Sequence, residues 1–215
     1  MFDRIAPDYD RMNRILTGRS DQRWRRALLD RLHVGPSDRV LDLACGTGDF
    51  SELAADRGAR VLGLDFAGAM LAVAARRVPA AQLVRGDALH LPLREGSVSV
   101  VVSGFALRNF VSLPPAFAEA ARALQPGGRM GLLEVDRPRS GFVRAGHGVY
   151  FNRVVPFIGG LLSSDRQAYR YLPESATYLP EEGELLAMLR AAGFSQIVKR
   201  RHMFGAIQAI TAVRR

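Results

Sequence analysis

From residue 38 to about 136, short runs of apolar residues typical of strands alternate with segments whose apolar residues have helical spacing. Short and almost continuously apolar runs predict five strands, at 39–44, 60–65, 81–86, 97–103 and 129–135. Helical spacing predicts three helices between these runs, at 51–57, 67–77 and 113–124. Strands that alternate with helices of this length indicate a doubly wound, mostly parallel α/β sheet.

Three stretches lie outside this alternation. Residues 1–33 predict one or two amphipathic helices, and residues 137–180 are irregular and rich in aromatic side chains. The last stretch predicts a helix at 181–192 and then an antiparallel hairpin of strands 194–201 and 207–213 around Gly205. We therefore expect a single domain over 1–215, made of an N-terminal helical lid (1–33), a core (34–136), a cap insertion (137–180) and a C-terminal helix and hairpin (181–215).

Length and composition exclude several classes of protein. The chain has 215 residues, of which 48% are hydrophobic, enough for one well-cored domain. Cys45 is the only cysteine, so a disulfide framework and a zinc cluster are excluded, and we predict no metal site. We find no signal peptide and no run of about 18 apolar residues that could span a membrane. We therefore expect a cytoplasmic protein.

The chain is strongly basic, with a net charge of +9, and Lys199 is the only lysine among its 30 basic residues. A basic surface suits nucleic acid, anionic lipid or small acidic substrates. Codon bias in a GC-rich genome explains the excess of arginine equally well, so charge alone does not identify a partner.

A glycine-containing loop, residues 46–48, follows the first predicted strand. Glycines at a strand-to-helix turn let a ligand approach the backbone closely, although Gly-x-Gly by itself is a weak signal. Asp42 and Asp49 flank the loop, so a pyrophosphate would be repelled and a cationic ligand attracted. No Gly-Lys-Ser/Thr sequence is present, which excludes a P-loop.

S-adenosylmethionine fits these requirements, because it carries a sulfonium, an ammonium and an adenosine but no phosphate. Asp65 closes the second strand, where a carboxylate can accept the ribose hydroxyls, and Asp87 follows the third, within reach of adenine. All these positions are at carboxyl ends of strands, where open α/β sheets bind ligands. We interpret Cys45 as a small buried residue and not as a nucleophile. The predicted cofactor-binding residues are Asp42, Gly46, Thr47, Gly48, Asp65, Phe66, Asp87, Ala88 and Ser103.

Five segments together resemble one family of class I methyltransferases, which have a Rossmann-like fold. They are residues 2–13, 23–26, 103–109, 122–134 and 169–175. These segments are similar to signatures of the UbiE/MenG/COQ5 quinone C-methyltransferases, and the resemblance extends over nearly the whole chain. It implies that Thr47, Asp65, Asp87, Ala88 and Ser103 contact the cofactor, in agreement with the positions reached from the strand ends.

The resemblance implies methylation of a ring carbon in a polyprenylated quinol, as in the conversion of demethylmenaquinol to menaquinol. The ring carbon is a poor nucleophile until a neighbouring hydroxyl, with an ordinary pKa of about 10, is ionised. We predict that Arg108 stabilises the phenolate, that Asn109 orients the ring or Arg108, and that Tyr171 belongs to the site. A water, His147, Tyr171 or Asp136 could accept the proton, and the sequence does not choose among them.

Several alternatives remain open. Within the family, the substrate could instead be the 2-methoxy-6-polyprenyl-benzoquinol of the ubiquinone pathway. The chain could also methylate RNA or another small molecule, although it lacks an appended RNA-binding domain and we expect no nucleic acid partner. A non-catalytic protein that binds S-adenosylmethionine is a third reading. Residues 149–162 could line a channel for the prenyl tail or contact an anionic membrane, and a homodimer is compatible with the sequence.

Overall fold

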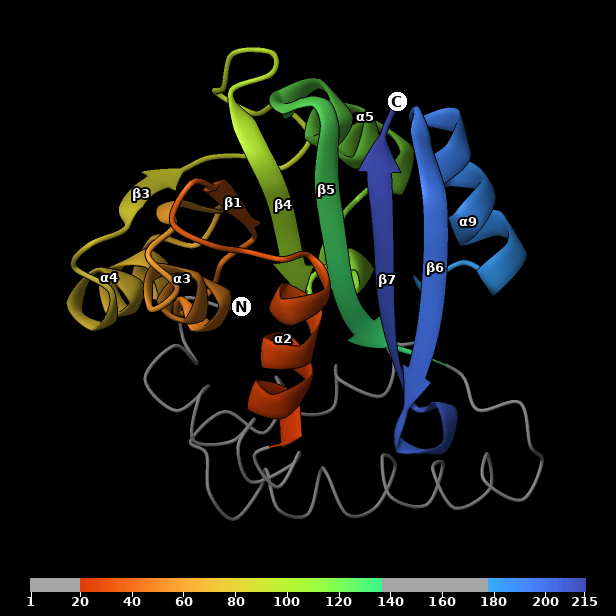
Figure 1. Ribbon diagram of the computed structural model, residues 1–215, viewed down its shortest axis with the longest axis horizontal. Helices are drawn as coiled ribbons and strands as arrows, with labels where there is room; N and C mark the ends of the chain where they lie inside the picture. The colour runs from red at the N-terminus through yellow and green to blue at the C-terminus, as the bar shows by residue number, and fades with distance from the viewer. Residues whose placement is uncertain (1–19, 137–177) are drawn as a thin grey trace.

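The computed structural model describes residues 20–136 and 178–215, which form a twisted sheet covered by helices on both faces (Figure 1). Within these residues the sheet has seven strands in the order β3-β2-β1-β4-β5-β7-β6. The strands are β1 (Arg39–Leu43), β2 (Arg60–Asp65), β3 (Gln82–Arg85), β4 (Val98–Gly104), β5 (Leu124–Val135), β6 (Phe194–His202) and β7 (Ile207–Arg214). The α-helices are α2 (Ser20–Arg31), α3 (Asp49–Ala55), α4 (Gly68–Arg77), α5 (Leu113–Ala123) and α9 (Glu182–Ala191). Two 3-10 turns are η1 (Leu107–Asn109) and η4 (Met203–Gly205).

The strand pairing confirms the predicted doubly wound sheet. Strands β1 to β5 are all parallel, and β1 pairs with both β2 and β4, so the strand order reverses between β1 and β4. The C-terminal hairpin is antiparallel, as predicted, and β7 pairs with β5 to close the sheet at that side. A ligand site is therefore expected at the carboxyl ends of β1 and β4, where the order reverses.

Helices cover both faces of the sheet (Figure 1), and two clusters of buried apolar residues hold them there. On one face, Leu28 of α2 and Phe50 of α3 pack with Val100 of β4. On the other face, Phe117 of α5 and Leu189 of α9 belong to a second cluster of buried residues. Because both faces are covered, β1 and β4 are buried along nearly their whole length and show no alternation of buried and exposed positions.

Helix α2 lies so close to β5 that only glycine fits at Gly131. A Cβ atom there would lie 2.6 Å from Leu32 Cδ1 and 3.1 Å from Leu28 Cγ. This close approach fixes the first described helix of the predicted lid against the sheet.

The structure differs from the sequence prediction in one strand. Strand β5 begins at Leu124 and not at Arg129, because Leu124 already pairs with Val98 before a register irregularity. Gly127, with a φ of 72°, provides the turn that was predicted here without ending the strand. The predictions for residues 1–19, for 149–162 and for Tyr171 lie outside the described residues.

Candidate functional site

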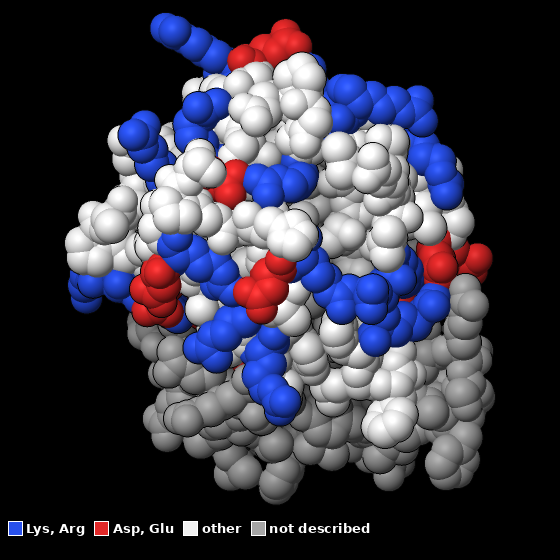
Figure 2. Space-filling model, in the orientation of Figure 1, with Lys and Arg blue, Asp and Glu red and all other residues white. Residues whose placement is uncertain are grey.

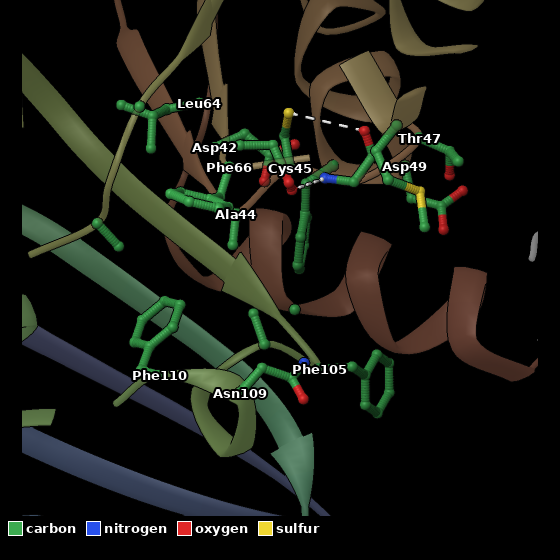
Figure 3. A pocket seen from close by; sticks show the side chains of 18 of the residues that line it. Asp42, Ala44, Cys45, Thr47, Asp49, Leu64, Phe66, Phe105, Asn109 and Phe110 are labelled. Atoms are coloured by element: carbon green, nitrogen blue, oxygen red, sulfur yellow. Dashed lines mark hydrogen bonds between the residues drawn. The ribbon is translucent and has the colours of Figure 1, made fainter. Parts of the chain in front are cut away.

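A pocket of about 430 Å³ lies at the carboxyl ends of β1, β2 and β4, where the strand order reverses. Figure 3 shows two walls facing each other, one from the loop after β1 and the other from the loop after β4. The predicted residues that line it are Asp42, Gly46, Thr47, Asp65, Phe66, Asp87, Ala88 and Asn109. Gly48 and Ser103 were also predicted to bind the cofactor, but they are not among the described residues that line the pocket.

The glycine loop is held in place by Asp65, which ends β2. Its carboxylate accepts hydrogen bonds from the backbone N–H of Gly46 and of Ala67, both at 2.8 Å. Gly48 has a φ of 90°, and a Cβ there would lie 3.3 Å from Val78 of the loop after α4. Glycine is therefore required at position 48 for both conformation and packing.

Ser103 stiffens the pocket and does not line it. It is buried in β4, and its hydroxyl donates a 2.8 Å hydrogen bond to the backbone oxygen of Leu43 in β1. This bond joins β1 and β4 at the edge where they separate. The prediction that Ser103 binds the cofactor stays a prediction, because the described geometry gives it a scaffold contact.

Asp42 lies at the base of the pocket and is completely buried. Its carboxylate accepts hydrogen bonds from the backbone N–H (2.9 Å) and the hydroxyl (2.7 Å) of Ser51. Burial dominates over these bonds and raises the pKa of Asp42 to about 7. The carboxyl group is therefore partly protonated at neutral pH.

Asp49, the other acidic residue beside the loop, is engaged by two arginines. Its carboxylate lies 3.3 Å from Arg25 Nη2 and 2.8 Å from Arg77 Nη2. Burial opposes ionisation, but the two guanidinium groups outweigh it and hold the pKa of Asp49 below its usual value. The sequence argument expected both carboxylates to attract a cationic ligand. The structure corrects this expectation, because Asp42 is partly protonated and Asp49, although ionised, is paired with two arginines. The other two carboxylates that line the pocket are those of Asp65 and Asp87.

The raised pKa of Asp42 predicts a pH-dependent stability. Between the ordinary aspartate pKa and about 7, the folded chain binds more protons than the unfolded chain, so stability falls as pH rises. The slope is about 1.4 kcal/mol per pH unit, or on the order of 3 kcal/mol between pH 5 and pH 7. Denaturant titrations across this range should show the slope in the wild type and lose it in Asp42→Asn. Parallel curves for the two proteins would contradict the assignment.

Arg25 of α2 forms part of the pocket wall and was not identified from the sequence. It is 5% exposed, its guanidinium lies 5.4 Å from the ring centre of Phe50 and 5.2 Å from that of Phe105, and it is 3.0 Å from Asp21. Among the described residues that line the pocket it is the only arginine or lysine. The sequence could have indicated this position, because Arg25 lies on the same buried helix face as Trp24, Leu28 and Leu29.

Arg108 does not lie where we predicted. We expected it to project over the cofactor pocket, but it is 9% exposed and is not among the described residues that line the pocket. Its Nη1 lies 2.5 Å from Oε1 of Glu134, a carboxylate buried in β5. A buried carboxylate needs a cation to offset its loss of solvation, and Arg108 is the one that reaches it. Its neighbour Asn109 does line the pocket.

The Arg108–Glu134 pair leaves hydrogen-bonding capacity unused. Glu134 Oε1 also accepts the N–H of Val135 at 2.9 Å, while Oε2 has no partner among the described residues. Arg108 contacts Glu134 through Nη1, and its guanidinium carries further N–H donors on Nε and Nη2. Glu134 is a second functional candidate that the sequence did not indicate.

Cys45 is buried, as predicted, and its environment does not favour a thiolate. Burial, followed by the charges of Asp42 and Asp65, raises the pKa of its thiol well above the ordinary value. Within residues 20–136 and 178–215 there is no cluster of side chains that could hold a metal ion. The helices of these same residues include none that is long and apolar enough to cross a membrane.

The pocket fits S-adenosylmethionine better than a phosphate-containing nucleotide. Asp65 and Asp87 stand at successive strand ends and can accept hydrogen bonds from hydroxyl and amino groups. Phe66, Met70 and Ala88 provide an apolar surface beside them for an adenine ring. Four carboxyl groups and one guanidinium line the described wall, a balance that suits a ligand with two positive charges and one carboxylate.

Comparisons with known proteins agree with this chemistry. The ubiE/COQ5 methyltransferase family model matches residues 1–214. A demethylmenaquinone methyltransferase of Thermus thermophilus is 45% identical over 201 residues, which cover 91% of each chain. A demethylmenaquinone methyltransferase of Lactiplantibacillus plantarum is 37% identical over 218 residues, covering 97% of this chain and 92% of that one. The fold also resembles a solved SAM-dependent methyltransferase of Thermotoga maritima, with a TM-score of 0.69 at 19% identity, over 100% of this chain and 98% of the other.

Proposed function

The chain belongs to the ubiE/COQ5 methyltransferase family, and we propose that this S-adenosylmethionine-dependent enzyme converts demethylmenaquinol to menaquinol. The proposal of this substrate rests on the similarity to two demethylmenaquinone methyltransferases. They are 45% and 37% identical to this chain, and each alignment covers more than nine-tenths of both chains. The Rossmann-like sheet, and the pocket at the place where its strand order reverses, support the assignment of S-adenosylmethionine as the cofactor.

Cofactor binding is assigned to the carboxyl edge of the sheet. We propose that Asp65 accepts the ribose hydroxyls, that Asp87 and Ala88 lie against the adenine, and that the N–H groups of the loop at 46–48 surround the methionine part. Asp65 suits this role because it already orders the loop through Gly46 and Ala67. When bound, S-adenosylmethionine supplies a methyl group carried on a positively charged sulfur.

The quinol ring is assigned to the side of the pocket formed by η1. Asn109 lines the pocket and can orient a ring hydroxyl. Arg108 precedes it on η1, outside the described lining, and is proposed to donate its remaining N–H groups to the oxygen as that oxygen gains negative charge. The buried pair with Glu134 holds the guanidinium in a fixed orientation. Arg108 is not itself the base, because a guanidinium hardly loses a proton.

Asp136 is poorly suited to accept the proton from the substrate. Its carboxylate lies 2.8 Å from Lys199 Nζ and 3.1 Å from Arg201 Nε, so two basic side chains already engage it. His147 and Tyr171, the other side chains considered, lie outside the described residues.

A polyprenylated quinol resides in the bilayer, so the enzyme must work at a membrane surface. We propose a cytoplasmic protein that binds the membrane peripherally. Homodimer formation is a separate proposal, and the size of the protein in solution tests it.

The reaction is tested with purified protein and methyl-labelled S-adenosylmethionine. We offer a short-chain demethylmenaquinol, the corresponding benzoquinol of the ubiquinone pathway, and total RNA in separate reactions. Label should enter the naphthoquinol, and mass spectrometry should place the new methyl group on the ring carbon. Preferred labelling of the benzoquinol would move the chain to the ubiquinone pathway, and labelling of RNA would overturn the proposal.

A further inference from the structure

The turn between β6 and β7 presents two apolar side chains to solvent. Phe204 is 91% exposed and Met203 is 51% exposed. Both residues have left-handed backbone conformations, with φ of 47° at Met203 and 54° at Phe204. Such conformations are unfavourable for non-glycine residues and are commonly retained where function requires them. We call these two residues the tip.

The tip lies at the same edge of the sheet as the pocket. His202, the last residue of β6, pairs with Ile207, and Ile207 also pairs with Val135 at the carboxyl end of β5. The backbone N–H of Asp136 donates a 2.7 Å hydrogen bond to the oxygen of Ala206. The tip therefore extends past the edge where the parallel strands end (Figure 1).

Near the tip lie arginines that form no ion pair with an acidic residue within 20–136 and 178–215. Arg23 and Arg31 are exposed on α2, and Arg200 is exposed on β6. Helix α2 and β6 meet there, because the ring of Trp24 lies 6.1 Å from that of His202. Figure 2 shows Lys and Arg side chains gathered over the lower parts of α2 and of the hairpin. We call Arg23, Arg31 and Arg200 the basic flank.

Two charges of the basic flank, those of Arg31 and Arg200, are close enough to affect each other and His202. Burial and then Arg200 lower the pKa of Arg31, and burial, Arg31 and Arg200 lower the pKa of His202. The basic residues on the other face of β6 differ, because Lys199 and Arg201 pair with Asp136 and Glu182. An anionic surface would relieve the repulsion on the flank side only.

We propose that the tip inserts into the interface of an anionic lipid bilayer while the basic flank contacts the lipid headgroups. Arg200 precedes Phe204 by four residues, which corresponds to at most roughly 13 Å along a strand. If the phenyl ring of Phe204 lies at the boundary of the acyl chains, Arg200 therefore lies at the depth of the headgroups. This orientation turns the pocket edge toward the membrane. The purpose of the contact rests on the proposed quinol substrate, but the contact itself requires neither quinol nor cofactor.

Vesicle binding without quinol or cofactor tests the surface. Wild-type protein should bind vesicles of phosphatidylglycerol and phosphatidylcholine, bind pure phosphatidylcholine weakly, and dissociate as salt is added. Met203→Asn/Phe204→Asn should weaken partition about tenfold or more, because the apolar contact is lost. Asparagine tolerates the left-handed backbone, so the turn is retained.

The chain offers a matched control for the arginines. The double variant Arg31→Gln/Arg200→Gln removes one arginine at a helix end and one in a strand, both in the basic flank. The control variant Arg60→Gln/Arg76→Gln removes one strand arginine and one helix-end arginine outside the basic flank. All four side chains are exposed. The first pair should weaken binding about tenfold or more, at about fivefold per arginine, and the second should have little effect.

Several results would overturn the proposal. If the tip variant binds vesicles as strongly as the wild type, the tip does not insert into the bilayer. If the two arginine pairs have equal effects, only the overall charge of the protein matters. A tip variant that changes from dimer to monomer while still binding vesicles would make the tip an interface between copies. Loss of RNA binding with vesicle binding intact would make the surface a nucleic acid site. Methylation of a short-chain soluble quinol is measured separately, so failure of the proposed function is distinguished from failure of the membrane surface.

Discussion

Asp65→Ala is expected to weaken S-adenosylmethionine binding tenfold to hundredfold. Loss of hydrogen bonds to a charged group typically costs about 1.5–3 kcal/mol, which corresponds to this range of affinity. Asp65 also accepts hydrogen bonds from the N–H groups of Gly46 and Ala67, so the variant loosens the loop as well. Calorimetric titration with S-adenosylmethionine measures the change directly.

The direct role of Asp65 can be separated from its role in the loop. A 2′-deoxyribose analogue of S-adenosylhomocysteine should bind the wild type more weakly than the parent compound does, and Asp65→Ala should not distinguish the two. Asp30→Ala removes an equal charge at an exposed pair with Arg57 and should leave cofactor affinity unchanged. Equal affinities of wild type and Asp65→Ala, with circular dichroism intact, would mean that the ribose binds elsewhere.

The sheet could be predicted from the sequence because its pattern is local. Continuous apolar runs such as 97–103 indicate strands buried on both faces, and glycine or proline between the runs indicates where they end. The antiparallel hairpin around Gly205 followed from two such runs separated by a short turn, and the pairing of β6 with β7 confirms it. The predicted start of β5 was wrong because Leu124 already pairs with Val98, before the irregularity around Gly127 and the continuous pairing that begins at Arg129.

The backbone of the pocket could also be predicted, because strand ends converge in a known way. Asp65 and Asp87 were chosen only as acidic residues after strands, and both line the pocket. Their side chains point into it because the carboxyl ends of parallel strands share one edge. Local pattern and topology together were sufficient for this part of the site.

The pairing of charged side chains could not be predicted. Arg108 and Glu134 are 26 residues apart and meet only because η1 packs on β5. Asp49 attracted attention as a free negative charge, but α2 and α4 bring Arg25 and Arg77 onto it. Charge at a site depends on burial and on partners from other elements, and the sequence pattern contains neither.

Arg108→Ala is expected to reduce the turnover of quinol methylation by about 10²–10³ while S-adenosylmethionine affinity changes little. Removal of one preorganised donor to a developing oxyanion typically has this effect on rate. The cofactor is proposed to bind at Asp65 and the loop at 46–48, and the ion pair of Arg108 is with Glu134 of β5 and not with this loop. Single-turnover kinetics and calorimetry on the same preparations separate the two quantities.

Glu134→Gln is the matched control, because it breaks the same buried ion pair but keeps the donors of Arg108. Both variants should lose stability, since each leaves a charge buried without its counter-ion, which typically costs about 3–5 kcal/mol. In Glu134→Gln the side-chain oxygen can still accept from Nη1 and orient the guanidinium, so the large loss of turnover should be confined to Arg108→Ala. Activity is therefore measured at low temperature on protein shown to be folded, and Arg108→Lys should recover part of the rate, because a point charge lacks the planar fork.

The pH dependence distinguishes oxyanion stabilisation from a general structural defect. As the pH approaches the ordinary phenol pKa of about 10, the quinol ionises without help, so the rates of wild type and Arg108→Ala should converge. A variant that merely displaces Asn109 would stay slow at every pH, because alignment of the ring does not improve when it ionises. Equal loss of turnover in Arg108→Ala and Glu134→Gln, with no convergence at high pH, would assign the pair to holding η1 on β5 and remove Arg108 from the chemistry.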